Sequence, residues 1–312
     1  MRPLSGIRVI DLTRVLAGPF AAMLLGDLGA EVIKIEQPGS GDDARGFGPF
    51  KDGVSGYFMS VNRGKRGMTL NLKHPKGKEI LRQLVGQSDV LVENFRPGVM
   101  DRLGLGYEAL AKVNPRLIYA ATSGFGQTGP YAGKAAYDMI VQGMSGIMSI
   151  TGEPDGEPVR VGTSIADLSA ALFTVTGVLA ALYSRERTGR GQMLDVAMLD
   201  SVVALLENAV VRCAMTGESP KPLGARHPAV TPFEMFKSKD GHVILALSNE
   251  AQWQKFIEAT GARELAAPEF ATNPLRTENH DKLKPLMDAI IARKTTAEWI
   301  AEMEQIGIAC GP

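Results

Sequence analysis

The first third of the chain alternates short β-branched runs with segments of helical periodicity, and this alternation constrains the fold most strongly. The runs that have the composition of buried strands are Ile7–Leu12, Glu31–Glu36, Met68–Leu72, Asp89–Glu93 and Leu117–Thr122. Helices are predicted between them, over Phe20–Leu28 and Pro75–Gln87. Strands separated by helices pair in parallel through right-handed crossovers. We therefore predict an α/β fold with a doubly wound, Rossmann-like sheet.

The remaining chain is predicted to contain a long apolar helix, a linker and a second region of mixed strands and helices. The helix is predicted from about Asp167 to Arg185, and it is followed by a strand, Met193–Ala197, and a helix, Ser201–Met215. The segment Gly217–Pro232 is rich in glycine and proline, which is typical of a linker. After it we predict a hairpin that turns at Asp240-Gly241 and three helices: Gln252–Thr260, Lys282–Arg293 and Thr296–Ile306. We expect a large domain over residues 1–220 and a smaller α+β domain over residues 221–312.

Composition excludes several classes of partner. The 34 basic residues balance the 34 acidic ones, so no global positive field would attract nucleic acid. Two cysteines cannot build a disulfide framework or a zinc cage, and the start of the chain has no apolar signal region. We predict a cytoplasmic protein with no metal. The uncharged run Leu168–Ser184 is interpreted as a buried core helix and not as a membrane span.

Familiar catalytic patterns are missing from the sequence. It has no Gly-x-Gly-x-x-Gly after the first strand, no phosphate-binding Gly-Lys-Ser/Thr loop and no nucleophilic Gly-x-Ser-x-Gly turn. Its four histidines, His74, His227, His242 and His280, are most simply surface or turn residues.

Asp167 is the acidic residue that stands out, because it directly precedes the long apolar helix. Its pattern predicts a helix cap, or the acid of a capping box with Ser164. The helix dipole would lower the pKa of such a carboxyl and keep it ionised. An ionised carboxylate is also what a carboxylate nucleophile requires, so the two interpretations remain compatible.

Two loops could bind a nucleotide. Asn94-Phe-Arg-Pro-Gly98 follows a predicted strand and, with Arg102 and Lys73, offers an aromatic face and three cations. Val15–Pro19 lies where a doubly wound fold places its first phosphate-binding turn. Ordinary solvated loops would look the same in both places.

Ordered motifs along the whole chain resemble those of the class III coenzyme A (CoA) transferases, a family that includes formyl-CoA and carnitine-CoA transferases. They are the opening segment from Pro3 to Phe20, Gly29–Glu36, Val92–Gly98, Gly124–Pro130, Arg187–Gln192 and Gly307–Pro312. The resemblance implies that CoA and acyl-CoA are substrates, that no cofactor is tightly bound, and that a small carboxylic acid is the acceptor. It also implies a homodimer of interlocked subunits, and a C-terminal part of the large lobe beyond Pro312.

The same resemblance implies a covalent mechanism in which Asp167 is the catalytic carboxylate. Asp167 would attack the acyl-CoA thioester to give a mixed anhydride, and the CoA thiolate would return to form an aspartyl-CoA thioester. The acceptor carboxylate would then take the CoA through a second anhydride. Since anhydrides hydrolyse, the site has to be covered, and the segment Gly124–Gly133 is one candidate for the cover.

The CoA site is likewise implied by the resemblance. Matching residues are Val15, Leu16 and Ala17 beside the adenosine; Leu70, Asn71, Leu72 and Lys73 at the next strand end; Asn94, Phe95, Arg96 and Arg102 at the phosphates; and Ala135, Ala136, Tyr137 and Asp138 beside the pantetheine arm. The chain departs from some relatives at Gln37, where they carry an arginine near the adenine.

Two alternatives are weighed against transfer. A 2-methylacyl-CoA racemase would share the fold and Asp167, but it carries a histidine where this chain has Tyr137. A phenol, with a pKa of about 10, is a poor proton exchanger at neutral pH, which favours the transferase. A CoA-binding protein without activity is the other alternative.

Overall fold

The computed structural model describes residues 2–312, which form two compact units. The larger comprises residues up to Ser149 together with Val159–Pro220, and the smaller comprises Ile150–Pro158 with Lys221–Pro312. The division after residue 220 coincides with the glycine- and proline-rich segment. The loop Ile150–Pro158 groups with the smaller unit, although it lies within the predicted domain 1–220; its Gly152 carbonyl accepts from the Gly224 N–H at 2.9 Å.

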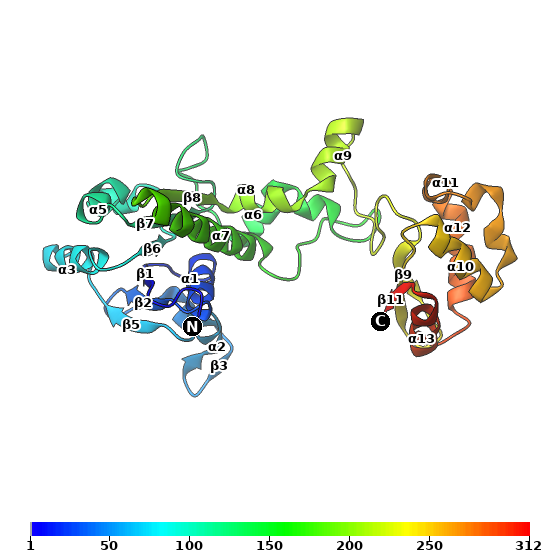
Figure 1. Ribbon diagram of the computed structural model, residues 1–312, viewed down its shortest axis with the longest axis horizontal. Helices are drawn as coiled ribbons and strands as arrows, with labels where there is room; N and C mark the ends of the chain where they lie inside the picture. The colour runs from blue at the N-terminus through cyan, green and yellow to red at the C-terminus, as the bar shows by residue number, and fades with distance from the viewer. Residues whose placement is uncertain (1) are drawn as a thin grey trace. The chain divides into compact units, whose positions relative to one another are not determined.

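A parallel six-stranded sheet forms the centre of the larger unit (Figure 1). Its strand order is β5-β2-β1-β6-β7-β8, and every pairing in it is parallel. This is the order of doubly wound nucleotide-binding sheets, with the reversal of direction between β1 and β6. The strands are β1 Arg8–Asp11, β2 Glu31–Glu36, β5 Arg66–Thr69, β6 Val90–Glu93, β7 Ile118–Ser123 and β8 Met193–Ala197. The predicted parallel α/β class is confirmed.

Alternate strand residues enter two separate cores, because successive side chains of a strand point to opposite faces. Val9 and Val90 pack with α1 (Ala17–Asp27) and α7 (Ile165–Thr188), whereas Ile10 and Leu91 pack with α3 (Pro75–Val85) and α5 (Tyr107–Val113). Figure 1 shows these two pairs of helices on the two sides of the sheet. The remaining elements of this unit are α2 Gly56–Asn62, α4 Val99–Arg102, α6 Asp138–Ser145, α8 Met198–Leu205, α9 Asn208–Thr216, the 3-10 helix Asp43–Gly46 and a small hairpin, β3 Phe50–Lys51 with β4 Val54–Ser55.

Some element bounds differ from the prediction. Helix α1 begins at Ala17 and not at Phe20, and β5 ends at Thr69, so residues 70–73 form a loop and not a strand end. The helix predicted over Ser201–Met215 is two helices, because Glu207 adopts a positive φ of 27° between α8 and α9.

Helix α7 is also less buried than expected. It is long and apolar enough to cross a membrane by length and composition alone, although core helices pass the same test. Its Ala171, Val175 and Val178 lie in the core, but Leu172 and Tyr183 are exposed. An uncharged sequence does not reveal which side of a helix meets its own sheet.

The smaller unit is an antiparallel three-stranded sheet covered by helices. The predicted hairpin is confirmed as β9 Phe233–Lys237 and β10 His242–Ala246, which Ser238–Gly241 connects, and β11 Ala309–Gly311 pairs with β10. The helices, which pack around the buried Trp253 and Trp299, are α10 Glu250–Thr260, α11 Asn273–Glu278, α12 His280–Ile291, α13 Thr296–Ile306 and two 3-10 turns, Arg263–Ala266 and Pro268–Phe270.

Candidate active site

A cavity of about 680 Å³, here called the first cavity, opens at the carboxyl ends of β1, β2, β5 and β6. This is the edge at which open parallel sheets bind ligands. Among its lining residues are Thr13, Arg14, Glu36, Gln37, Asp42, Asp43, Leu70, Asn71, Leu72, Lys73, Phe95 and Arg102. The size and the mixed lining suit a nucleotide-like ligand.

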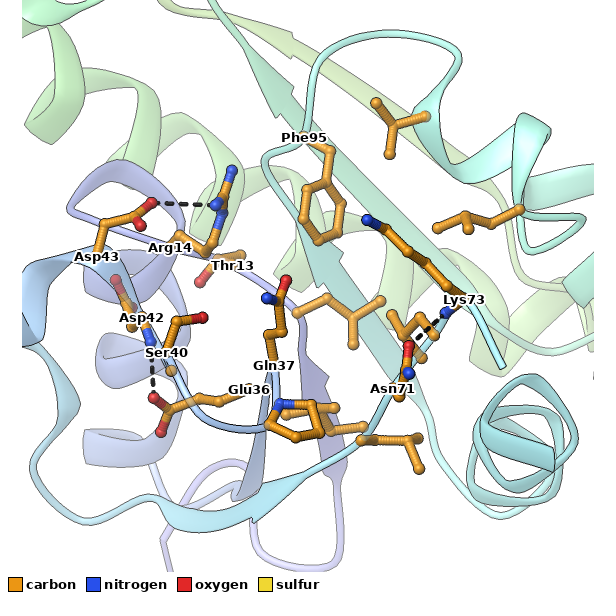
Figure 2. Close-up of a pocket in the computed structure, with 18 of the residues that line it drawn as sticks. Thr13, Arg14, Glu36, Gln37, Ser40, Asp42, Asp43, Asn71, Lys73 and Phe95 are labelled. Carbon is orange, nitrogen blue, oxygen red and sulfur yellow. Dashed lines mark hydrogen bonds and ion pairs between the residues drawn. The ribbon is translucent and has the colours of Figure 1, made fainter. Parts of the chain in front are cut away.

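Cations and one aromatic ring face each other across the first cavity. Figure 2 shows Phe95 and Lys73 on one side and Arg14 and Gln37 on the other. The guanidinium of Arg14 lies 5.7 Å from the Phe95 ring and pairs with Asp43 at 3.0 Å. An aromatic face with lysine and arginine nearby can stack on a base and neutralise phosphates.

Some of the predicted CoA-binding residues line the first cavity and others do not. Those that line the first cavity are Leu70, Asn71, Leu72, Lys73, Phe95 and Arg102; those that do not are Val15, Leu16, Ala17, Asn94, Arg96, Ala135, Ala136, Tyr137 and Asp138. Asn94 instead holds the backbone of Arg14, since its amide accepts from the Arg14 N–H and donates to the Arg14 carbonyl, both at 2.8 Å.

Glu93 stabilises the loop that carries Phe95. The residue is only 4% exposed, and its carboxylate accepts hydrogen bonds from the Phe95 N–H at 2.7 Å and the Tyr119 hydroxyl at 3.3 Å. Burial raises the pKa of Glu93 to about 7, although these two hydrogen bonds act to lower it.

The loop between β1 and α1 has a constrained backbone. Val15 has a φ of 69°, a region that a β-branched residue rarely adopts and that costs about 1–3 kcal/mol. Its N–H donates to Asp42 at 3.0 Å, and the buried carboxylate of Asp42 pairs with Lys34 at 2.9 Å. Lys34 also donates to the Thr13 carbonyl at 2.9 Å. A buried ion pair therefore holds the loop that leads directly into α1.

Asp167 lies in the first turn of α7, and its carboxyl meets the N–H of Ala17, the first residue of α1. Desolvation by burial raises the pKa of Asp167 to about 7, the charge of Asp138 adds to the rise, and the Ala17 N–H opposes it. The predicted lowering by the helix dipole is wrong, because burial and a second carboxylate outweigh it.

The capping box of Ser164 and Asp167 is also wrong, because Asp138 performs the capping. Ser164 makes no side-chain cap hydrogen bond, whereas Asp138 accepts from the Ala166 N–H at 2.9 Å. The other oxygen of Asp138 accepts a hydrogen bond from the side-chain amide of Gln142. The oxygen of that same amide accepts from the Val161 N–H. The start of α7 is thus fixed from α6.

A second cavity, of about 530 Å³, adjoins Asp167. Its lining comprises Leu16, Phe20, Met23 and Leu24 of the α1 region, Tyr57, Ser60, Val61 and Arg63 of the α2 region, and Arg160, Gly162, Thr163, Ser164 and Leu168 before and within α7. Burial is the main cause that raises the pKa of Tyr57, and the negative charge of Asp167 raises it further. Sequence reasoning missed Tyr57 and this cavity, because α2 is short and carries no motif.

Within the described part of the larger unit, Asp167 has neither a metal centre nor a histidine base beside it. Residues 2–312 contain no group of three or more side chains suited to a metal ion. His74 caps α3 by accepting from the Lys76 N–H, and the other histidines belong to the smaller unit. Tyr137, at the position of the racemase histidine, is 73% exposed. The racemase alternative is not favoured.

Comparison with known proteins agrees with the motifs. A model of CoA-transferase family III matches residues 4–312. An acetyl-CoA:oxalate CoA-transferase of Acetobacter aceti is 48% identical over 99% of this chain and 80% of its own, and a succinyl-CoA:glutarate CoA-transferase of Mus musculus is 43% identical over 100% and 72%.

Solved structures give the same result. A CAIB/BAIF family protein from Brucella suis matches with a TM-score of 0.86 at 42% identity, covering 100% of this chain and 84% of its own. Rv3272 of Mycobacterium tuberculosis matches with a TM-score of 0.89 at 32% identity, covering 99% and 83%. The chain therefore belongs to CoA-transferase family III and is a CoA-transferase.

Proposed function

We propose that this enzyme moves CoA from an acyl-CoA to a small carboxylic acid, with Asp167 as the nucleophile. The observation that carries the proposal is the setting of Asp167: a half-buried carboxyl whose pKa desolvation raises to about 7, beside the Ala17 N–H and next to Ser164 and Leu168 of the second cavity. Desolvation strengthens a carboxylate as a nucleophile, because it removes the water that stabilises the charge.

Each step exchanges one bond for another. An oxygen of Asp167 attacks the thioester carbonyl, the C–S bond breaks, and CoA leaves as thiolate from a mixed anhydride. The thiolate then attacks the carbonyl of Asp167 and releases the donor acid. The acceptor carboxylate attacks this aspartyl-CoA thioester, and the thiolate finally attacks the acceptor's carbonyl, which restores the Asp167 carboxylate.

The Ala17 N–H supports this chemistry at the carbonyl of Asp167. When thiolate or acceptor attacks Asp167, negative charge develops on its oxygen, and an N–H already directed at the carboxyl stabilises that charge. Only the ionised carboxylate can attack in the first step, so the reactive fraction of the enzyme rises as pH passes about 7.

The first cavity would hold the nucleotide end of CoA as a substrate, with no cofactor permanently bound. Lys73 and Arg102 supply charge for the phosphates and Phe95 supplies a stacking face. The backbone from Val15 to Ala17 connects this cavity to Asp167, and Ala135–Asp138 would accompany the pantetheine arm.

The relatives favour a dicarboxylic acid as acceptor. Their names specify oxalate, glutarate and mesaconate, and the donors named are acetyl-CoA and succinyl-CoA. We propose an acid of this kind for the present chain, and we also propose that the enzyme acts in the cytoplasm.

We further propose that the enzyme is a homodimer. Exposed apolar side chains are concentrated on α6 and α7, among them Met139, Ile140, Met144, Leu172, Phe173, Leu179 and Tyr183. A surface of this kind is typical of a subunit interface. Whether the subunits interlock, as the resemblance implies, can be tested by the molar mass of the protein before and after denaturation and refolding.

Trapping the covalent intermediate tests the mechanism. Incubation with acyl-CoA alone, followed by rapid denaturation and mass spectrometry, should find CoA attached to the peptide that contains Asp167. Asp167→Asn should carry no CoA, whereas Asp200→Asn, a change at an exposed carboxylate of α8, should carry as much as the native enzyme. CoA on another residue, or on Asp167→Asn, would contradict the proposal.

A further inference from the structure

The second cavity differs from the first in that its walls are largely apolar. Leu16, Phe20, Met23 and Leu24 come from α1 and the residue before it, and Leu168 comes from α7. Such walls favour methylene groups over water, since burying apolar surface is favourable. The cavity is therefore suited to a short aliphatic chain.

Asp167 does not itself line the second cavity, but residues from three segments near it do. Leu168 follows Asp167 in α7, and Leu16 precedes Ala17, whose N–H meets the Asp167 carboxyl. Tyr57 is close enough that the negative charge of Asp167 raises the pKa of its hydroxyl. The cavity therefore lies next to the position that an acyl group on Asp167 would occupy.

Two guanidinium groups are the only charged groups among the lining residues, and they differ in what neutralises them. Arg63 pairs with the Asp27 carboxylate. Arg160 donates to the carbonyl oxygens of Val161 at 3.1 Å and Gly162 at 3.0 Å, and it has no carboxylate partner within residues 2–312. Arg160 therefore brings an uncompensated positive charge to the cavity.

We propose that the second cavity binds the chain of a dicarboxylic acid and that Arg160 anchors the carboxylate that does not react. This inference rests on the proposed function of Asp167 and adds the residue that selects the acid. Guanidinium and carboxylate can form two parallel hydrogen bonds, which fixes the far end of the acid while its other end reacts. The apolar walls favour acids with methylene groups over oxalate, which has none.

The test compares two thioesters that differ only at their far end, glutaryl-CoA and pentanoyl-CoA, in the formation of the covalent CoA adduct. In the native enzyme glutaryl-CoA should react faster. Arg160→Gln should lower kcat/KM for glutaryl-CoA by about ten- to a hundredfold, the range expected for one charge-assisted pair, and leave pentanoyl-CoA within about twofold. Arg160→Lys should restore part of the loss.

Arg66→Gln is the matched control, because it removes an exposed guanidinium that does not line the second cavity and is already paired with Glu31. It should change both thioesters by less than about threefold. The inference is overturned if glutaryl-CoA keeps its advantage in Arg160→Gln, if both thioesters lose equally, or if Arg66→Gln causes the same selective loss.

A binding measurement separates this inference from the mechanism. Calorimetric titration of the native enzyme and Arg160→Gln with free glutarate reports on the cavity whether or not an adduct forms. Weaker binding only to Arg160→Gln supports the anchor even if Asp167 proves not to be the nucleophile, and equal binding to both proteins refutes it.

Discussion

The two cavities of the larger unit are built in different ways. The first lies at the ends of parallel strands, so its residues follow strand patterns that can be recognised along the chain. The second lies between α1, α2 and the start of α7, and its residues come from segments with no shared pattern. Strand ends concentrate polar loops at one edge of a sheet, whereas a site between helices depends on how they pack.

Near each cavity lies an acid whose pKa is raised by desolvation: Glu93, which is buried, and Asp167, which is half-buried. Burial brings the pKa of both Glu93 and Asp167 to about 7. Glu93 is hydrogen-bonded by Phe95 and Tyr119, so it supports a loop, while Asp167 meets a single N–H and a second carboxylate. A raised pKa alone does not distinguish a supporting acid from a reactive one.

The largest expected effect is at Asp167. Asp167→Ala should lower the rate of CoA transfer by a factor of about 10³ or more, because no other group takes over a lost nucleophile. Acyl-CoA binding should stay within several-fold of native, since the first cavity is unchanged. Steady-state rates and equilibrium binding check both parts. Activity close to native, or binding lost together with activity, would remove the functional distinction between the cavities.

An intermediate effect is expected in the first cavity. Lys73→Ala should raise KM for acyl-CoA roughly tenfold at low salt and leave kcat unchanged, because the lysine contacts a part of the substrate that does not react. Lys76→Ala removes an exposed lysine that does not line the cavity, so its KM should remain within about twofold. Equal effects of the two variants would indicate a general charge effect instead of a phosphate contact.

The smallest effect concerns Glu93 and stability. Because its pKa is raised from 4.5 to about 7, the folded state keeps a proton that the unfolded state has lost, so the free energy of unfolding falls as pH rises through this window. Glu93→Gln has no carboxyl to titrate, so its free energy of unfolding should not fall in this way. The difference in free energy of unfolding between the variant and the native protein should therefore shift in favour of the variant by about 2 kcal/mol from pH 5 to pH 8. Urea unfolding at both pH values measures it.

Two observations make the Glu93 experiment specific. Glu79→Gln, at an exposed position of α3, should show no such pH dependence. Glu93→Gln should also retain CoA transfer, because its amide can still accept from the Phe95 N–H. A strong loss of transfer would show that Glu93 does more than support the loop.

The sequence predicted the parallel sheet, because strands and helices depend on local patterns, and six of the predicted CoA-binding residues line the first cavity. Runs such as Ile7–Leu12 and the segment after Asp89–Glu93 fix where strands end and where ligand-binding loops begin. It located Asp167 through the family motif, but it predicted the wrong direction for its pKa. Desolvation reverses that direction, and the Asp138 carboxylate adds to the rise; Asp138 is 29 positions away in the chain and meets α7 only after folding.

The capping of α7 by Asp138 couples two elements that are separate along the chain. The Asp138 carboxylate accepts from the Ala166 N–H, one residue before Asp167, and Asp138 itself begins α6. A displacement of α6 would therefore be transmitted mechanically to Asp167 through one hydrogen bond, with no substrate involved. Helix α6 also carries the exposed Met139 and Ile140, so a partner that packs there would act on the element that caps the helix of Asp167.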